Sequence, residues 1–298
     1  MPELPEVESL RRGLLVKLRG QKIKKVSVSK PKLVSGKGNI RVASAHKRTE
    51  FIRELQGEVI KDISRRAKNL IFHFRSGKIL LVHLKMSGQF IYREKGVNAV
   101  IGGHPIEISE KILPNKHSHI IFELTRGTLY YNDTRMFGYL LYYPDLKYFD
   151  RAGHFNTLGL EPLTKDFTLI EFEKRLKTKT GKLKTVLMNQ SVVTGLGNIY
   201  CDEVCFRART KPTRLISTLK SHEIKEIHQA IKYILPRAIA LGGSSVASYR
   251  LADGSRGNYA REHKVYGRAG EKCARCGQIL NKIILNGRTT VFCNNCQK

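Results

Sequence analysis

The opening segment of the chain carries apolar residues at helical spacing, with Pro5 near its start and Gly20 just beyond its end. Proline fits the first turn of a helix and glycine commonly follows the last turn. The segment therefore predicts one amphipathic helix that begins almost at the first residue. Its apolar positions recur every three or four residues, at Leu4, Val7, Leu10, Leu14 and Leu18.

Residues 23–143 change to short apolar segments separated by turn residues, a pattern typical of strands. Arg126 and Gly127 lie between two such segments and predict a hairpin. We therefore expect an antiparallel β-sandwich or flattened barrel. Residues 94–115 contain Gly and Pro but no clear period, and they predict a surface insertion. The clearest predicted strands are residues 69–74, 79–84, 89–92, 120–124 and 128–131.

A helical pattern begins after Pro144, Gly153, Gly159 and Pro162, which predict a linker. Pro236 is predicted to kink or end the last helical run. The predicted helices are residues 169–176, 183–189, 198–206 and 221–241. The change of pattern predicts three domains, which cover residues 1–146, 147–260 and 261–298.

The charge of the chain is strongly one-sided. Among its 298 residues, Lys and Arg total 54 whereas Asp and Glu total 25, so the formal net charge is +29. A hydrophobic content of 41% is high enough for folded domains, so we expect the basic residues on the surfaces of folded domains rather than in a disordered tail. We expect a polyanionic partner. Nucleic acid is the first interpretation, and an anionic membrane surface or a ribosomal context are the alternatives.

Targeting and membrane segments are not expected in this chain. Glu3, Glu6 and Glu8 argue against a secretory leader, and charged residues interrupt the apolar stretch at 231–241. We therefore expect a cytoplasmic protein without a membrane partner. We also expect a monomer.

Four of the six cysteines form two pairs with two-residue gaps, and sixteen residues separate the pairs. In a reducing compartment this spacing predicts a metal site rather than disulfides. Four protein thiolates leave no coordination position for water, so we expect one structural zinc ion that supplies folding energy to a short tail. Cys201 and Cys205 are interpreted as buried core thiols. The expected zinc ligands are Cys273, Cys276, Cys293 and Cys296.

The N-terminus offers a nucleophile. Removal of Met1 would leave Pro2 with a free secondary amine, and a secondary amine that attacks a sugar anomeric carbon forms a cationic iminium, which acts as an electron sink. Glu3 is the adjacent proton carrier, and Glu6 lies about one helical turn further on. Taken alone, the same residues are also ordinary first-turn helix residues.

Together these motifs resemble the formamidopyrimidine-DNA glycosylase family of DNA repair enzymes. The resemblance extends over the whole chain, and the N-terminal octapeptide is its most specific motif, which separates the chain from the related endonuclease VIII branch. Membership implies an α+β multidomain fold: an N-terminal antiparallel β-sandwich with an N-terminal helix, then a helix-two-turn-helix domain with a four-cysteine zinc finger. The matching segments are residues 1–8, 135–138 and 195–200, and the cysteine tail with Arg288.

The resemblance also implies an activity. Family members are bifunctional DNA glycosylases and apurinic or apyrimidinic site lyases of base excision repair, which in a bacterium act in the cytoplasm at the nucleoid. They excise 8-oxoguanine and formamidopyrimidines from double-stranded DNA through a Schiff base at the N-terminal proline, followed by β,δ-elimination, and they also cut at abasic sites. The alternative is a protein on the same scaffold that binds lesions without catalysis or with altered specificity.

Carried over residue by residue, the resemblance implies that Pro2 is the nucleophile, Glu3 the general acid/base and Glu6 its support. Lys68 is the fourth residue that the resemblance implies to be catalytic, and it matches a lysine that approaches the lesion and its phosphate. Six further positions match residues that contact DNA. His83, Asn198 and Arg288 match phosphate ligands, whereas the gap left by an everted base is filled by Met86, Arg135 and Phe137. Bases inside a duplex must be turned out before chemistry, which apolar wedges and an arginine make easier.

Spacing alone gives several of these residues plainer interpretations: a solvated charge for Lys68, a sheet-edge histidine for His83, and core positions for Met86 and Phe137. The chain also departs from the family pattern in the loop after Gly243, which covers the everted base and sets lesion preference. There the lesion-loop candidates are Ser244, Ser245 and Tyr249. Departures that remove no proposed catalytic group are Thr134, Met136, Asn189 and Asn294.

Overall fold

The computed structural model describes residues 1–36, 40–94, 100–103, 113–244 and 257–298, with the backbone alone at 100–103. It divides into two compact units. The first consists of Met1–Pro2, Glu6–Asn156 and Gly242–Gly257, and the second of Glu3–Pro5, Thr157–Leu241 and Asn258–Lys298.

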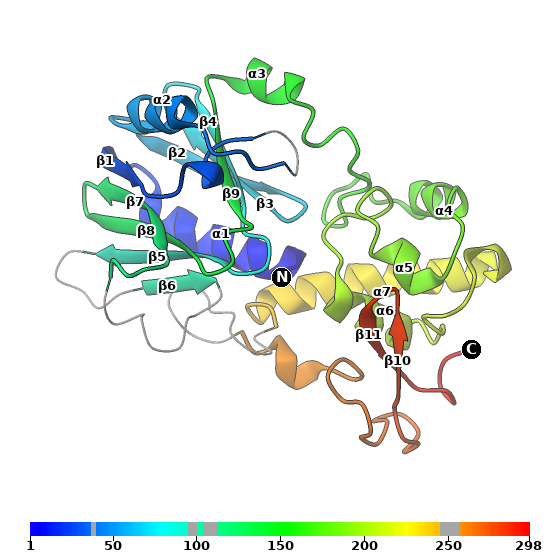
Figure 1. The fold of residues 1–298 in the computed structure, drawn as a ribbon. Coiled ribbons are helices and arrows are strands. Elements are labelled where there is room, and N and C mark those ends of the chain that lie inside the picture. The colour runs from blue at the N-terminus through cyan, green and yellow to red at the C-terminus, as the bar shows by residue number, and fades with distance from the viewer. Residues whose placement is uncertain (37–39, 95–99, 104–112, 245–256) are drawn as a thin grey trace. The chain divides into compact units, whose positions relative to one another are not determined.

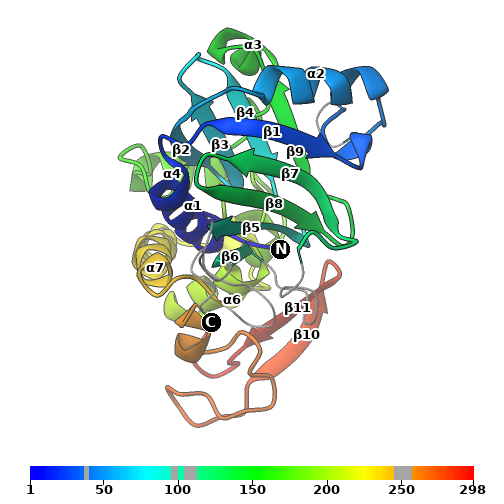
Figure 2. The same ribbon diagram turned by 90° about the vertical axis from the view of Figure 1, so that its left-hand side faces the viewer.

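The first unit is built on two antiparallel sheets that lie one over the other (Figures 1 and 2). One sheet has the strand order β1-β7-β8-β5-β6, and the other has the order β2-β3-β4-β9. The first sheet contains β1 Ile23–Val28, β5 Gly88–Glu94, β6 Val100–Gly103, β7 Ser118–Leu124 and β8 Gly127–Asp133. The second contains β2 Ile60–Arg66, β3 Asn69–Phe74, β4 Ile79–His83 and β9 Tyr139–Tyr143.

Alternate side chains of the two sheets meet in one core, as the period of two in a strand requires. The rings of Phe72 on β3 and Phe90 on β5 lie 5.8 Å apart between the sheets. Helix α1, Leu4–Leu18, adds the apolar face expected from its spacing to the same core, at Val7, Leu10, Leu14 and Leu18. The predicted N-terminal helix, the hairpin at Gly127 and the antiparallel sandwich are therefore confirmed.

Two elements of this unit differ from the sequence-based expectation. The strand-rich stretch contains helix α2, Ala45–Leu55, in which Ser44 caps the N-terminus by accepting a hydrogen bond from the Lys47 amide (3.2 Å). The segment at 94–115 contributes β6 to the sheet rather than forming only an insertion, because Val100–Gly103 pairs with β5. Residues 95–99 and 104–112 of that segment lie outside the described residues.

The predicted linker also contains a helix, α3 Leu146–Arg151, whose N-terminus is capped by the Asp145 carboxylate. Beyond it, the second unit has the four predicted helices, which are confirmed. The longest continues past Pro236, so the expectation that this proline could end the run is wrong. Proline removes the hydrogen bond to the Lys232 carbonyl, and Lys232 is exposed, so water can replace that bond. The helices are α4 Leu169–Lys177, α5 Leu183–Leu187, α6 Asn198–Arg207 and α7 Ser221–Ala240.

The helices of the second unit enclose an apolar core in which Cys201 and Cys205 are fully buried, as predicted. The chain ends in a two-stranded hairpin, β10 Asn281–Leu285 and β11 Arg288–Phe292, which lies between the two cysteine pairs in the sequence. None of the helices in the described part of the chain has the length and apolar character needed to cross a membrane.

Candidate active site and nucleic-acid interface

Glu3 lies at the N-terminus of α6. Its carboxylate accepts hydrogen bonds from the amides of Ile199 (2.9 Å) and Tyr200 (3.4 Å). Unpaired N–H groups and the helix dipole stabilise a negative charge at this position. A Cβ added at Gly197 would lie 2.5 Å from the carboxyl carbon, so only glycine leaves room for this approach. Pro2, the residue before Glu3, is buried.

Glu6 contacts the start of the predicted lesion loop. Its Oε1 accepts a hydrogen bond from the Ser244 amide (2.7 Å), and both residues are almost fully buried. Gly243 has φ +81°, and a Cβ there would lie 2.8 Å from the same oxygen. A carboxylate predicted to support catalysis is thus placed against the first residue of the loop. Ser245 and Tyr249 lie outside the described residues.

Lys68 forms part of the tight turn between β2 and β3, after Ala67, which has φ +54°. Lys68 is only 5% exposed, so the plainer interpretation of a solvated charge is wrong. The positive charge of Lys68 acts on His83, because Asn69 pairs directly with His83 in the next strand. The hairpin therefore brings two of the predicted DNA-contacting residues to one sheet end.

His83 ends strand β4, and its Nδ1 accepts a hydrogen bond from the Lys85 amide (2.9 Å). Burial and the neighbouring charges of Lys85, Lys68 and Arg41 lower the pKa of His83 to about 3. The imidazole is therefore neutral near pH 7, with its proton on Nε2. A neutral histidine in this tautomer is a hydrogen-bond donor, as a phosphate ligand must be.

Met86, Arg135 and Phe137 lie on two neighbouring loops and are exposed to solvent. Met86 is 39% exposed and Phe137 is 51% exposed, so the interpretation of both as core residues is wrong. The Arg135 guanidinium lies 4.7 Å from the centre of the Phe137 ring, within the range of a cation–π contact. Exposed apolar and cationic side chains at loop tips suit insertion into a duplex.

Asp133 holds the two loops together. Its Oδ1 accepts hydrogen bonds from the amides of Arg135 (3.2 Å) and Met136 (3.0 Å), and its Oδ2 accepts one from the Gly138 amide (2.8 Å). The Ser87 hydroxyl, next to Met86, donates to the same carboxylate. Our sequence analysis missed this fully buried carboxylate, although an aspartate at the start of a polar turn is a known signal for such hydrogen bonds.

Asn198 is the first residue of α6 and follows the glycine-containing turn at 195–197. Burial raises the pKa of Tyr266, and the Asn198 side chain opposes that rise. A side-chain amide at a helix N-terminus is well placed to meet an anion. Tyr266 stands beside it as a second candidate contact that the sequence alone did not single out.

Arg288 lies at the start of β11, directly after a tight turn at Asn286 and Gly287, both of which have positive φ. Its residue is exposed. The hairpin that carries it has only a small core of its own, formed with Phe206, Val265 and Leu280. Other contacts must therefore fix its position in the second unit.

A buried ion pair provides such contacts. Lys184 on α5 lies 2.7 Å from Asp202 on α6, and both side chains are 1% exposed. Lys184 Nζ also donates to the Thr289 carbonyl and the Thr290 hydroxyl, each at 2.9 Å. Asp202 Oδ2 accepts a hydrogen bond from the Val291 amide (3.1 Å). These contacts join β11 to the helix that begins at Asn198, and no local sequence pattern indicated them.

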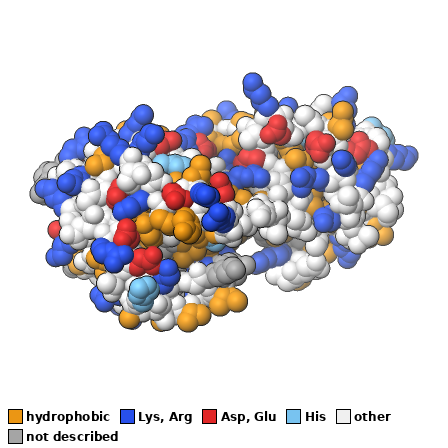
Figure 3. All heavy atoms as spheres, turned by 90° about the horizontal axis from the view of Figure 1, so that it is seen from above, with side chains coloured by type: hydrophobic (Ala, Val, Ile, Leu, Met, Phe, Trp, Pro, Cys, Tyr) orange, Lys and Arg blue, Asp and Glu red, His pale blue; other side chains and the backbone are white. Residues whose placement is uncertain are grey.

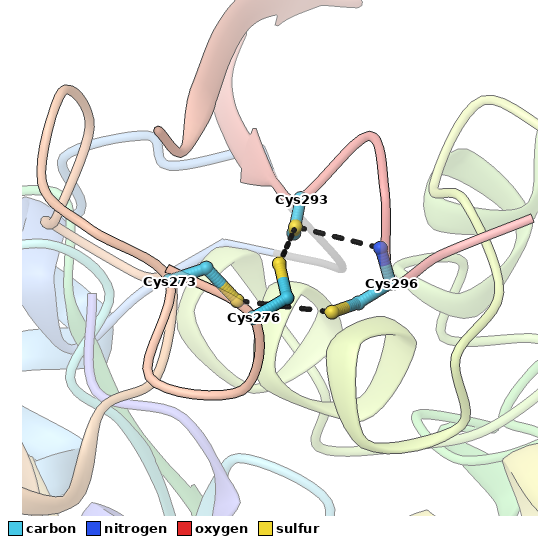
Figure 4. Close-up of side chains that lie close together, drawn as sticks. All are labelled: Cys273, Cys276, Cys293 and Cys296. Atoms are coloured by element: carbon cyan, nitrogen blue, oxygen red, sulfur yellow. Dashed lines mark hydrogen bonds between the residues drawn. The ribbon is translucent and has the colours of Figure 1, made fainter. Parts of the chain in front are cut away.

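The four predicted zinc ligands lie together, with their sulfur atoms within 4.8 Å of one another (Figure 4). Sulfur separations of 3.9 Å (Cys273–Cys296) and 3.5 Å (Cys276–Cys293) are close to the ~3.8 Å edge of a tetrahedron with Zn–S bonds of about 2.3 Å. The thiolates of Cys273, Cys276, Cys293 and Cys296 therefore fit one structural zinc ion. When bound, it supplies folding energy to this tail.

Lys and Arg side chains lie over much of the face drawn in Figure 3, in line with the net charge of +29. Such a surface attracts polyanions and gives salt-dependent binding.

Comparison with known proteins agrees with this geometry. Residues 1–140 match the sequence model of the formamidopyrimidine-DNA glycosylase N-terminal domain. Residues 158–250 match the H2TH domain of the same family, and residues 270–298 match a zinc finger found in FPG and IleRS.

Full-length relatives give the same result. The formamidopyrimidine-DNA glycosylases of Listeria monocytogenes and Bacillus subtilis are each 38% identical to this chain, over 100% of it and 100% and 99% of their own lengths. A crystal structure of a Lactococcus lactis FPG variant with Fapy-dG DNA matches with a TM-score of 0.85 and 35% identity, and covers both chains completely. The Thermus thermophilus MutM protein matches with a TM-score of 0.82 and 33% identity, over 99% and 98% of the two chains. Since its motifs, its folded units and its whole length all agree with these proteins, the chain belongs to the formamidopyrimidine-DNA glycosylase family.

Proposed function

We propose that the protein is a bifunctional DNA glycosylase and abasic-site lyase of base excision repair. Its substrates are oxidised purines, 8-oxoguanine and formamidopyrimidines, in double-stranded DNA, together with abasic sites. Solved Lactococcus lactis relatives at 34–36% identity are complexes with DNA that carries Fapy-dG lesions or an abasic site. In this proposal the enzyme works in the cytoplasm on nucleoid DNA, and its similarity to bacterial proteins of this name supports that location.

The observation that carries this proposal is the buried Glu3 carboxylate on the amides of α6, next to Pro2 in the sequence. Ordinary first-turn residues of a helix are solvated, whereas this carboxylate is 3% exposed and is held by the amides of a different helix. Burying a charge is costly unless it is hydrogen-bonded. Such a fixed carboxylate beside a candidate nucleophile is typical of a catalytic acid/base.

In the proposed reaction, the lone pair of the Pro2 amine forms a bond to C1′ of the damaged nucleotide, and the bond from C1′ to the base breaks. The base leaves with the electron pair and takes up a proton. Loss of the amine proton and opening of the sugar ring give the iminium. Glu3 carries protons to and from the sugar, and Glu6 supports Glu3 in this acid/base role. Removal of the C2′ proton then expels the 3′ phosphate, and a second elimination expels the 5′ phosphate.

The other candidate residues handle the DNA in this proposal. Lys68, which is buried beside His83, approaches the lesion and its phosphate. Met86, Arg135 and Phe137 fill the gap that the everted base leaves, and their exposure supports this role. Phosphates are bound by His83, Asn198 and Arg288, while Ser244, Ser245 and Tyr249 belong to the loop that covers the base.

Borohydride trapping on duplex DNA with 8-oxoguanine opposite cytosine tests the nucleophile. The iminium is reducible, so the wild type should become covalently joined to DNA, and mass spectrometry of the trapped peptide should place the bond on Pro2 after loss of Met1. Pro2→Gly should bind an abasic-site analogue normally and lose most of the trapping. A control variant at an exposed lysine on α4, Lys174→Gln, should trap like the wild type.

Trapping that survives complete blockage of the N-terminal amine would assign the bond to a lysine and overturn the role of Pro2. Absence of both trapping and base release in a protein with a free Pro2 would favour a lesion-binding protein without catalysis.

A further inference from the structure

The second unit contains a basic hollow of about 630 Å³, formed by the C-terminal end of α6, α7, residues 259–264 and residues 274–275. A neighbouring hollow of about 480 Å³ shares two of its residues, Arg207 and Arg275, so the two form one continuous surface. The basic lining residues of the larger hollow are Arg207, Arg237, Arg261, Lys264 and Arg275.

The acidic lining residues are Glu203 and Glu262 in the larger hollow and Glu226 in the smaller one. Glu203 is 3% exposed, and its carboxylate accepts hydrogen bonds from the amides of Lys264, Val265 and Tyr266, at 2.9 to 3.1 Å. Glu262 pairs with Arg237 (3.1 Å). In the described part of the chain, the charged groups of the four other lining cations, Arg207, Arg261, Lys264 and Arg275, have no carboxylate within 4.0 Å.

Two of these arginines are held in place by aromatic rings. The Arg207 guanidinium lies 3.4 Å from the centre of the Tyr233 ring. The Arg275 guanidinium lies 4.4 Å from that of Phe206 and donates to the Phe206 carbonyl (3.2 Å). A stacked guanidinium keeps its edge N–H groups free for oxygen acceptors and loses less side-chain entropy when it binds them. Such groups are suited to phosphate oxygens.

Within the second unit, the hollow is distinct from the phosphate-binding candidates Asn198 and Arg288. Asn198 is the first residue of α6 and Arg207 is the last, so about 14 Å of helix separates them. Neither Asn198 nor Arg288 lines the two hollows.

We propose that this surface is a second DNA-binding site, which takes the phosphate backbone of an undamaged duplex segment while the lesion site is occupied. The continuity of the two hollows fits a row of phosphates rather than one small anion. Arg207 and Arg275 already cover the ring faces of Tyr233 and Phe206 on which a free base could stack, which argues against a nucleotide. A protein that contacts two segments can move between them without full release.

In the test, the lesion site is first occupied by one equivalent of a duplex that contains an abasic-site analogue and carries one fluorophore. An undamaged duplex with a second fluorophore is then titrated, and its anisotropy is measured at several salt concentrations while the first signal reports whether the lesion duplex stays bound. The variant is Arg261→Gln with Lys264→Gln, which leaves both stacked arginines in place. The control is Lys165→Gln with Lys174→Gln, which removes the same charge from two exposed lysines outside both hollows.

We expect the hollow variant to bind the second duplex roughly tenfold more weakly, and to lower the slope of log affinity against log salt by about 1.8, since each phosphate contact contributes about 0.9. The control should keep the wild-type affinity and slope. Equal losses in both variants, or no second duplex bound by the filled wild type, would overturn the proposal. Displacement of the second duplex by ATP at equal phosphate concentration would also overturn it, in favour of a nucleotide site.

Borohydride trapping on the lesion duplex is measured in the same preparations. It should be equal in the wild type and both variants, so failure of the proposed chemistry is distinguishable from failure of the second site.

Discussion

Two regions of this protein present exposed side chains on short segments, and they are fixed in different ways. In the β-sandwich, the loops with Met86 and Phe137 are held by Asp133, which accepts amide hydrogen bonds from residues two, three and five positions later. In the helical unit, the hairpin with Arg288 is held by four thiolates and by Lys184, which is 105 residues before its contact at Thr289.

The difference follows from how much core each segment has. The sandwich loops leave strands that are already buried in a large core, so a few hydrogen bonds, each worth about 1 kcal/mol net, suffice to select their conformation. The zinc hairpin has too few buried side chains to fold alone, so it depends on a metal ion and on a buried ion pair. Contacts with nearby residues set the conformation of the sandwich loops, whereas contacts with distant residues also determine whether the hairpin folds.

Removal of zinc should give the largest effect. Apparent binding free energies of structural zinc sites reach about 10–16 kcal/mol, so chelation or Cys276→Ser should unfold the hairpin and weaken DNA binding strongly. Hydrogen exchange should rise in β10 and β11 while the sandwich strands stay protected. Arg288→Ala should reproduce the loss of binding without the loss of protection. Protected hairpin amides in zinc-free protein would contradict this view.

Lys184→Ala should have the second-largest effect on stability and DNA binding. It leaves the Asp202 carboxylate buried without its cation, which typically costs about 3–5 kcal/mol, and it frees the end of β11. We expect a lower denaturation midpoint and weaker DNA binding. A double variant, Lys184→Met with Asp202→Leu, should regain most of the stability but not the binding, because no group then holds Thr289 and Val291. Full recovery of binding would show that the pair does not position the hairpin.

Asp133→Ala should have a smaller effect on stability and a selective effect on activity. The buried Gly138 amide left without an acceptor costs about 1–3 kcal/mol, the part-buried amides of Arg135 and Met136 can turn to water, and the loops lose their fixed shape. Excision of 8-oxoguanine from intact duplex should slow roughly tenfold or more, whereas cleavage at a preformed abasic site, which needs no eversion, should slow far less. Asp133→Asn keeps one acceptor oxygen, so its stability and its excision rate should lie between those of the wild type and of Asp133→Ala. Phe137→Ala should show the same selectivity without destabilisation.

The smallest effect concerns His83, which precedes the Met86 loop. Its lowered pKa of about 3 means that the folded protein should show no histidine titration at this position between pH 5 and 8 by NMR. The unfolded chain takes up a proton below about 6.5, so the free energy of unfolding should fall as pH drops from about 6.5 to about 3. His83→Gln should flatten that part of the stability curve. A His83 titration near pH 6.5 would disprove the burial argument.

The elements that sequence reasoning placed correctly are those with a clear local period. The apolar spacing of α1 and the run at Asn69–Phe74 were both sufficient because the side chains that define them follow one another along the chain. Helix α2 was missed inside a strand-rich stretch, although Ser44 is a good N-cap, and β6 was missed because its register depends on pairing with β5.

The candidate site divides in the same way. Its motifs were sufficient to name Pro2, Glu3 and the four cysteines, since an N-terminal amine, an adjacent carboxylate and paired thiolates carry their chemistry in their type and spacing. The spacing of residues along the chain could not predict which candidate side chains are buried. Lys68 is buried and Phe137 is exposed, the reverse of what their side-chain types favour.

The sequence by itself determined the family, the antiparallel sandwich, the four helices of the second unit, the zinc ligands and the candidate nucleophile, because each depends on residues close together in the chain or on their chemical type. Only the tertiary structure decided that Glu3 meets the amides of α6, that Glu6 meets Ser244 and that Lys184 pairs with Asp202. These partners are up to 238 residues apart. Their contacts exist only after folding has brought distant segments together, and no local period can encode them.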